Sequence, residues 1–428
     1  MKLLSACFSV LLLLPLQVQA WSNHSLGSSL ALAPLPGMTA ETLQVESLER
    51  FLEAEEEGLR ALLDEQERFA RAQFEEYPAR PDELRWQAGA ADRRAAFLQA
   101  LRINPETRLA LFFQAVPGTA PGQRERLDAG AVTVYRKLSL WSEWRFFKVG
   151  EGELLSPLAV LSSAADEPDY GHDINLFSDN PGTAGARYNF GTQPFGDARF
   201  EYSSQAPFHI GYYHEDPLVF AAGPFLRRTY PQWRAYQYIG LARFAFERGH
   251  PYWGYRFLGW GLHYLQDMTQ PYHASVLPGS TTAGLLWTAA KALGGFPADK
   301  QAAMARVATR HTEVEKYQLQ WLRSELASGD GQRSLLKAYA EVANDGRYPP
   351  FDYRYLRDTV ALESRQRADQ FDGLIGQWLD QQPAVGDFRQ GNQLTAARPD
   401  AQLQQLIIEL IGHFGAHTRN AVRATAPR

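Results

Sequence analysis

Two aromatic-rich helical segments in the middle of the chain constrain the fold more than any other feature. The first is predicted over residues 232–247, directly after Pro231, and Gly249-His250-Pro251 ends it because glycine and proline interrupt helices. The second is predicted over residues 253–268. Apolar residues also repeat at helical spacing in segments 41–77, 91–101, 283–293, 299–327, 335–342, 360–379 and 402–422. With one short strand expected at 132–135, the predicted fold class is all-α.

The first twenty residues have the pattern of a secretory signal peptide. Lys2 supplies a positive start, residues 11–14 form an apolar run of leucines, and residues 18–20 precede the expected cut. The apolar run is shorter than a bilayer span, which argues against a retained membrane anchor. We therefore expect a secreted or periplasmic protein whose mature chain begins at Trp21.

Cysteine usage and charge restrict the chemistry that the mature chain can perform. Cys7 is the only cysteine among the 428 residues, and it lies inside the predicted leader. Any metal site must then be built from His, Asp, Glu and backbone atoms. The formal net charge of −5 provides no overall attraction for nucleic acid, so no stable nucleic-acid partner is expected.

A histidine and an aspartate one helical turn apart stand at the end of the second helical segment. His263 and Asp267 project from the same face of a helix, and a following proline lets His273 approach from beside it. An imidazole and a carboxylate in this arrangement can hold zinc, and the second carboxylate oxygen can bridge to another metal. His311 and Glu315 repeat the same spacing. Two such pairs together with His273 predict a metal site.

Isolated histidines on other helices are interpreted as ordinary polar residues. His413 and His417 are four residues apart, with Glu409 one turn earlier, but nothing nearby supports a metal site there. His250 is interpreted in the same way.

The motif residues resemble a known superfamily. The string H-Y-x-x-D-x-x-x-P-x-H from His263 to His273, followed by H-x-x-x-E from His311, resembles the zinc-dependent phospholipase C and single-strand nuclease superfamily. The resemblance is closest to secreted bacterial zinc metallophospholipases C and covers about residues 21–24 and 165–320. It implies a multi-helix fold around a cleft with three zinc ions. Mature chains of this superfamily begin with a tryptophan whose amino and carbonyl groups bind zinc, a position that Trp21 would take.

Two further segments carry the resemblance and complete the implied set of zinc ligands. Pro168-Asp169-Tyr170 resembles the P-D-Y segment of the phospholipases, and Pro207-Phe208-His209 resembles the P-x-H segment of the nucleases. The resemblance implies three ligand sets: Asp169, His209, His263 and Asp267; His273, His311 and Glu315; and Trp21 and His24 with Asp267 bridging. His172 and His214 remain alternatives to His209, because the interval from Asp169 to His209 is longer than is usual in the superfamily.

The resemblance implies a zinc-dependent phosphodiesterase in which Asp169 assists proton transfer. Tyr170 follows directly, as in phospholipases whose aromatic residue there faces a choline cation through a cation–π contact. The absence of cysteines from the mature chain and of a basic stripe with interleaved aromatics also favours phospholipid over single-stranded nucleic acid. We therefore expect a phospholipase C that hydrolyses glycerophospholipids such as phosphatidylcholine at a membrane surface. A single-strand nuclease or nucleotidase is the alternative, and a zinc-stabilised interaction protein without activity is an alternative of another class.

The domain organisation follows from the extent of the resemblance. Residues 21–325 are expected to form the zinc-dependent catalytic domain, including a helical insertion at about 40–165. Residues 326–428 are expected to form a helical extension packed on that domain. Residues 166–217, rich in Gly, Pro, Asp and Asn, are expected to form a long ordered loop. The protein is expected to be a monomer.

Overall fold

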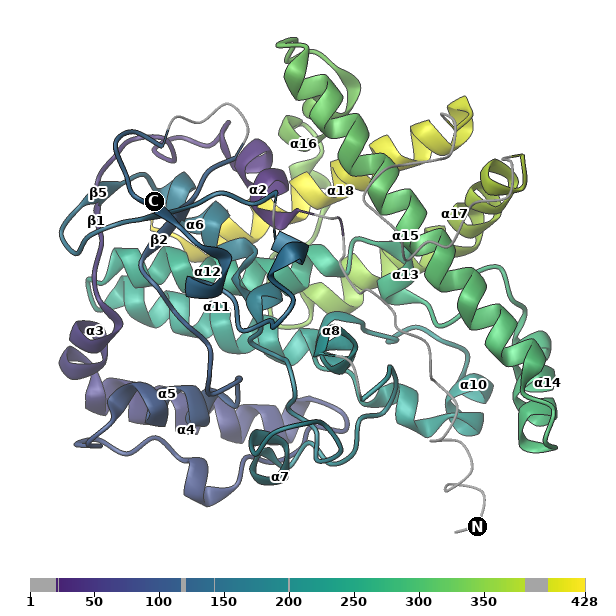
Figure 1. The fold of residues 1–428 in the computed structure, drawn as a ribbon, viewed down its shortest axis with the longest axis horizontal. Helices are drawn as coiled ribbons and strands as arrows, with labels where there is room; N and C mark the ends of the chain where they lie inside the picture. Colours follow the sequence, from purple (N-terminus) through teal and green to yellow (C-terminus); the bar gives the residue numbers. More distant parts are fainter. Residues whose placement is uncertain are drawn as a thin grey trace.

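The computed structural model describes residues 21, 23–116, 121–141, 143–198, 201–381 and 399–427. In this part the chain is mostly helical, which confirms the predicted all-α class (Figure 1). The predicted leader at residues 1–20 lies outside the described residues. None of the helices described combines the length and the apolar character that crossing a bilayer requires.

The two central helices lie side by side as a buried pair. α11 (Pro231–Glu247) and α12 (Pro251–Asp267) each begin with a proline, which is favourable in the first turn of a helix. Gly249 takes a φ of 82° in the turn between them, a conformation that glycine adopts without strain. The predicted helices and the break between them are therefore confirmed.

Glycines let α12 approach its neighbours closely. A Cβ on Gly261 would lie 2.7 Å from Ile239 of α11, and one on Gly259 would lie 2.7 Å from the Leu161 carbonyl of α6 (Pro157–Ala165). Because α12 is packed on both sides and nearly all of its residues are buried, its C-terminal turn is a rigid support for side chains.

The two ends of the described chain meet beside α12. α2 (His24–Leu32) packs against α18 (Ala401–Thr425), and a Cβ on Gly27 would lie 2.7 Å from the ring of Phe414 (Figure 1). α18 also contacts α12. The expected C-terminal helices are thus present and pack on the core, whereas the expected domain boundary at 325 stays a prediction.

The expected helical segment over residues 41–77 is confirmed over residues 48–73 apart from one break, and it is wrong at its start. The segment forms β1 (Leu43–Gln44), α3 (Leu48–Ala54) and α4 (Glu56–Gln73), with the break at Glu55, whose φ and ψ are −115° and 21°. Gly58 lies inside α4, where a Cβ would meet the Phe244 ring at 2.6 Å. This glycine therefore permits close helix packing and does not end the helix.

The expected strand at 132–135 is also wrong. Thr133 donates its amide hydrogen to the carbonyl of Ala129, so the backbone turns here, and no strand ladder includes these residues. The strands lie elsewhere: β1 pairs with β5 (Leu154–Leu155), and β4 (Phe146–Lys148) lies between β2 (Phe112–Gln114) and β3 (Arg126–Leu127).

The remaining predicted helices are confirmed within a few residues: α5 (Arg93–Leu101), α14 (Thr282–Leu293), α15 (Ala298–Ala327), α16 (Ser334–Ala340) and α17 (Leu362–Asp380). The expected loop at 166–217 contains short helices: η4 (Glu167–Tyr170), α7 (Ala184–Tyr188), α8 (Glu201–Ser204) and α9 (Ala206–His209). The other short elements are η1 (Asp82–Leu84), η2 (Ala129–Ala131), η3 (Leu138–Trp141), α10 (Pro217–Ala222), η5 (Pro224–Arg227), α13 (Pro271–Ala274), η6 (Asp345–Arg347) and η7 (Leu356–Ala361).

Candidate metal centre

Eight of the nine predicted ligands come together in three buried groups around the end of α12. The three groups are His24, His263 and Asp267; Asp169, His209 and His263; and His273, His311 and Glu315. In each group the candidate ligand atoms lie within 4.8 Å of one another. The side chains come from α2, η4, α9, α12, α13 and α15, so segments far apart in the sequence build the site together.

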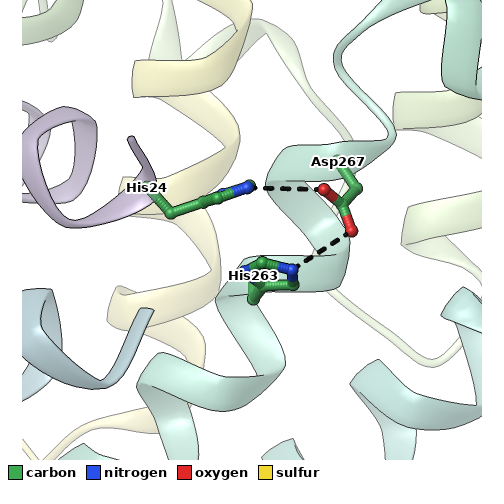
Figure 2. Close-up of side chains that lie close together, drawn as sticks. All are labelled: His24, His263 and Asp267. Carbon is green, nitrogen blue, oxygen red and sulfur yellow. Dashed lines mark ion pairs between the residues drawn. The ribbon is translucent and has the colours of Figure 1, made fainter. Parts of the chain in front are cut away.

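Asp267 is positioned to bridge two of these groups. Its Oδ1 lies 3.4 Å from Nε2 of His24, and its Oδ2 lies 3.5 Å from Nε2 of His263 (Figure 2). Oδ2 is also 3.0 Å from Nδ1 of His209. The two carboxylate oxygens therefore face different imidazoles, which is the arrangement that a carboxylate shared by two metal ions requires.

Hydrogen bonds fix which nitrogen of the imidazoles faces the centre. Nδ1 of His263 lies 2.7 Å from the carbonyl of Ala165, and Nδ1 of His273 lies 2.7 Å from the carbonyl of His209. A carbonyl oxygen only accepts, so Nδ1 carries the hydrogen in both rings and Nε2 keeps its lone pair. This is the tautomer and orientation that outer-sphere partners impose on metal-binding histidines.

Several buried polar atoms at the centre have no partner in the described chain other than another predicted ligand. They include Nε2 of His24, His273 and His311 and Oδ1 of Asp267. Such buried atoms are rare in folded proteins and each needs an explanation. All four belong to predicted ligands, and a metal ion would satisfy them. The donors are nitrogen and oxygen atoms, which suit zinc.

The three carboxylates at the centre have no arginine or lysine partner among the described residues. In the described part of the chain, the ion pairs of Asp169, Asp267 and Glu315 are all with histidines. Burial raises the pKa of Asp169 to about 7, although the nearby charges of His209 and His24 oppose this rise. Because uncompensated buried charge is unfavourable, these carboxylates favour the binding of cations.

The third group differs from the other two in its protonation. Nε2 of His311 lies 2.7 Å from Oε1 of Glu315, and Gln270 donates to the same oxygen at 3.4 Å. Burial lowers the pKa values of His273 and His311 to about 3, so both rings are neutral at physiological pH. The neutral imidazole is the form that binds metal.

His24 holds a proton more firmly than His273 and His311 do. Burial alone would lower the pKa of His24, but the hydrogen bond and the charge of Asp267 outweigh it and raise that pKa to about 9. Its Nδ1 lies 2.9 Å from Oε1 of Gln266. Gln266 in turn donates to Ser28 of α2 at 2.8 Å and to Thr418 of α18 at 3.1 Å. The C-terminal helix therefore helps to hold the residue that orients His24.

The carboxylate of Asp173 also supports the centre, and it was not predicted from the sequence. Oδ2 of Asp173 lies 3.7 Å from Nε2 of His209, on the side of the ring away from Asp267. Asp173 accepts hydrogen bonds from Arg234 at 2.6 Å and from the hydroxyl of Tyr264 at 2.5 Å. Asp173 and Arg234 are fully buried. Asp173 stands four residues after Asp169, and this spacing is the one sequence signal that could have identified it.

The structure places His209 at the centre and the two alternatives elsewhere. The ring of His172 packs edge-on against Trp260, with 4.7 Å between centroids. His214 lies 2.7 Å from the carbonyl of Arg357 through its Nε2. Neither belongs to the three groups.

The histidines of α18 form a separate polar cluster. Nδ1 of His413 lies 3.2 Å and Nε2 of His417 lies 3.1 Å from the same carboxylate, that of Glu363. Tyr355 contacts the other nitrogen of His417 at 2.9 Å. These partners agree with the interpretation of both histidines as polar residues of a packed helix.

The predicted contact of Tyr170 with a head-group cation needs correction. Tyr170 is 2% exposed, and its ring lies edge-on to Trp141 and Phe146 at 4.9 and 5.4 Å between centroids. Its hydroxyl donates to Gln114 and lies 3.4 Å from Asp166. The ring is enclosed by other aromatics, so it presents no face to a ligand.

Trp21 lies close to the centre. Its indole is buried and donates to Thr269 at 2.8 Å, two residues beyond Asp267. The carbonyl of Trp21 accepts from the amide of Asn23. The coordination of zinc by its amino and carbonyl groups stays a prediction.

An apolar pocket adjoins the third group. It encloses about 1130 Å³, solvent at its mouth included, and mainly apolar side chains of α10, α13, α14 and α15 line it. His311 forms part of its wall. The candidate metal centre is therefore flanked by a pocket suited to hydrocarbon.

No protein-family model, curated protein or solved structure matches this chain. The resemblance to the phospholipase C and nuclease superfamily thus stands on the motif residues alone. The geometry shows a mostly helical protein with three groups of His, Asp and Glu side chains that can bind metal ions.

Proposed function

We propose that this chain is an exported zinc-dependent phospholipase C that cleaves glycerophospholipids such as phosphatidylcholine to diacylglycerol and phosphocholine. The observation that carries the proposal is the convergence of three buried His and carboxylate groups, two of which share His263 while Asp267 contacts histidines of both. Zinc ions held by such ligands polarise phosphate oxygens and lower the pKa of bound water to about 7.

The composition of the groups supports catalysis over a purely structural role. Structural zinc sites are usually closed and rich in cysteine, whereas these groups contain only His, Asp and Glu. A bridging carboxylate also suits paired metal ions, which stabilise the displacement at a phosphodiester.

Asp169 is proposed to move a proton during the reaction. Its side chain is 10% exposed, more than the side chains of His209 and His263, with which it is grouped. Gln205 donates to its Oδ1 at 3.3 Å. A carboxyl whose pKa is about 7 in the metal-free site can gain or lose a proton near neutral pH.

The apolar pocket supports a lipid substrate over single-stranded nucleic acid. Leu285, Met304 and Val307 are among its lining residues, and they lie in the wall that also contains His311. Acyl chains gain free energy by leaving water for such a surface, whereas nucleic acid requires basic and stacking groups.

A parallel assay on the chain beginning at Trp21 tests the proposal. Zinc-dependent, chelator-sensitive release of phosphocholine from phosphatidylcholine is expected, without cleavage of single-stranded DNA. DNA cleavage alone would overturn the lipid substrate but keep the phosphodiesterase. Zinc binding with neither activity would favour an interaction protein.

The variant Asp169→Asn tests the role of Asp169. Its turnover of phosphatidylcholine should fall by about 100-fold or more with little change in substrate affinity, because a positioned acid–base group typically contributes this much. Asp82→Asn is the matched control, since Asp82 is exposed in η1. Equal turnover in both variants would remove Asp169 from the mechanism.

A further inference from the structure

Helix α14 and the turn after it present apolar side chains to solvent. Trp287 is 64% exposed and Phe296 is 72% exposed, and Leu293 is exposed as well. α14 lies at the edge of the molecule beside α10, where Leu218 adds another exposed apolar side chain (Figure 1). Single exposed apolar residues are ordinary, but several on one segment indicate a surface that binds something.

The α14 helix is apolar on two sides. Leu285, Leu286 and Ala289 line the pocket beside the metal centre, while Trp287 faces solvent. The helix therefore separates the pocket from the outside with hydrocarbon on both of its surfaces. A helix of this kind at the periphery indicates an apolar medium on its outer side.

This segment carries little charge, as a surface that enters the interface of a bilayer requires. Residues 276–298 contain a single charged side chain, Lys291, and no carboxylate. Its Nζ lies 5.6 Å from the Trp287 ring centroid and 2.7 Å from Asp299. Tryptophan and phenylalanine beside a lysine, on a segment with little charge, are typical of segments that lie in the interface of a bilayer.

We propose that the α14 surface, formed by Trp287, Lys291, Leu293 and Phe296, docks onto a phospholipid bilayer. Docking would place the pocket and its wall residue His311 beside the lipid from which substrate is drawn. In this respect the inference rests on the proposed phospholipase function, while the docking can be measured without turnover.

Vesicle flotation tests the docking. The chain beginning at Trp21 is mixed with vesicles of phosphatidylcholine containing a minor fraction of phosphatidylglycerol, and the fraction that floats is measured. The double variant Trp287→Ser, Phe296→Ser should bind at least about tenfold more weakly, because it removes two large apolar side chains from the contact. Leu154→Ser is the matched control, since Leu154 is 46% exposed on β5, and it should bind as the parent does.

Zinc content and the unfolding midpoint of each variant show whether it is folded. A double variant that is folded and binds vesicles as well as the parent would overturn the docking. If the parent does not bind vesicles but dimerises through Trp287 and Phe296 in sedimentation, the surface is an interface between copies and the proposal also fails. Vesicle binding that depends on these residues, without hydrolysis of any phosphodiester, would support the docking and refute the proposed function.

Discussion

Replacing Asp267 by Asn should remove two of the three expected metal ions at once. Asparagine has nearly the same shape, but one of its two terminal atoms is an amide nitrogen that cannot bind a cation. Oδ1 of Asp267 faces His24 of the first group, and Oδ2 lies 3.0 Å from Nδ1 of His209 in the second, so the change affects both groups. The third group has its own carboxylate, Glu315, and should keep its ion.

Mass action sets the size of the effect on stability. A ligand present at 100 times its dissociation constant stabilises the fold by about 2.7 kcal/mol per site. Loss of two sites in Asp267→Asn should therefore remove about 5 kcal/mol of zinc-dependent stability, whereas Glu315→Gln should remove about half as much. Without zinc, the Asp267 variant should lose its charge-assisted interactions with His209 and His24, about 1.5–3 kcal/mol each.

Metal analysis after dialysis and urea unfolding at buffered free zinc measure these changes. We expect one zinc ion per chain in Asp267→Asn and two in Glu315→Gln, from the three groups of the parent. The reasoning would be refuted if both variants lost the same number of ions, or if Asp267→Asn retained more than one.

Two further predictions concern protons and the start of the mature chain. Zinc binding at pH 7 should release at least about one proton and should weaken as the pH falls. The reason is that, without metal, Asp267 outweighs burial and raises the pKa of His24 to about 9, while burial raises the pKa of Asp169 to about 7. Calorimetry in buffers of different ionisation enthalpy counts the protons, and a count of zero would contradict this prediction. A chain with one extra residue before Trp21 should bind one zinc ion fewer than the chain that begins at Trp21. Equal metal contents would exclude the Trp21 amino group as a ligand.

Local patterns in the sequence were sufficient for the central helices and for the ligand pairs on them. Proline and glycine act on the backbone at their own positions, so the boundaries of α11 and α12 could be read directly from Pro231, Gly249 and Pro251. The four-residue spacing of His263 and Asp267 likewise needs only the helical repeat.

Contacts between distant segments decided the rest. Gly58 sits inside α4 because the helix packs there on Phe244, and a local pattern cannot distinguish such a glycine from one that ends a helix. Tyr170 is enclosed by aromatic rings that include Trp141 and Phe146, and its position beside Asp169 in the sequence gave no sign of this.

The candidate metal centre combines both kinds of information. The sequence determined which residues have the chemistry to bind zinc, because donor type and helical spacing are local properties. Which of them meet was decided by tertiary packing. The contact of α2 with the end of α12 brings His24 to Asp267, and α9 brings His209 to the same carboxylate. His214, which follows α9, contacts the carbonyl of Arg357 instead. The supporting residues Asp173 and Gln266 also emerged only from the folded chain, since their partners lie in other elements. Such contacts depend on long-range burial of apolar surface, which no local pattern encodes.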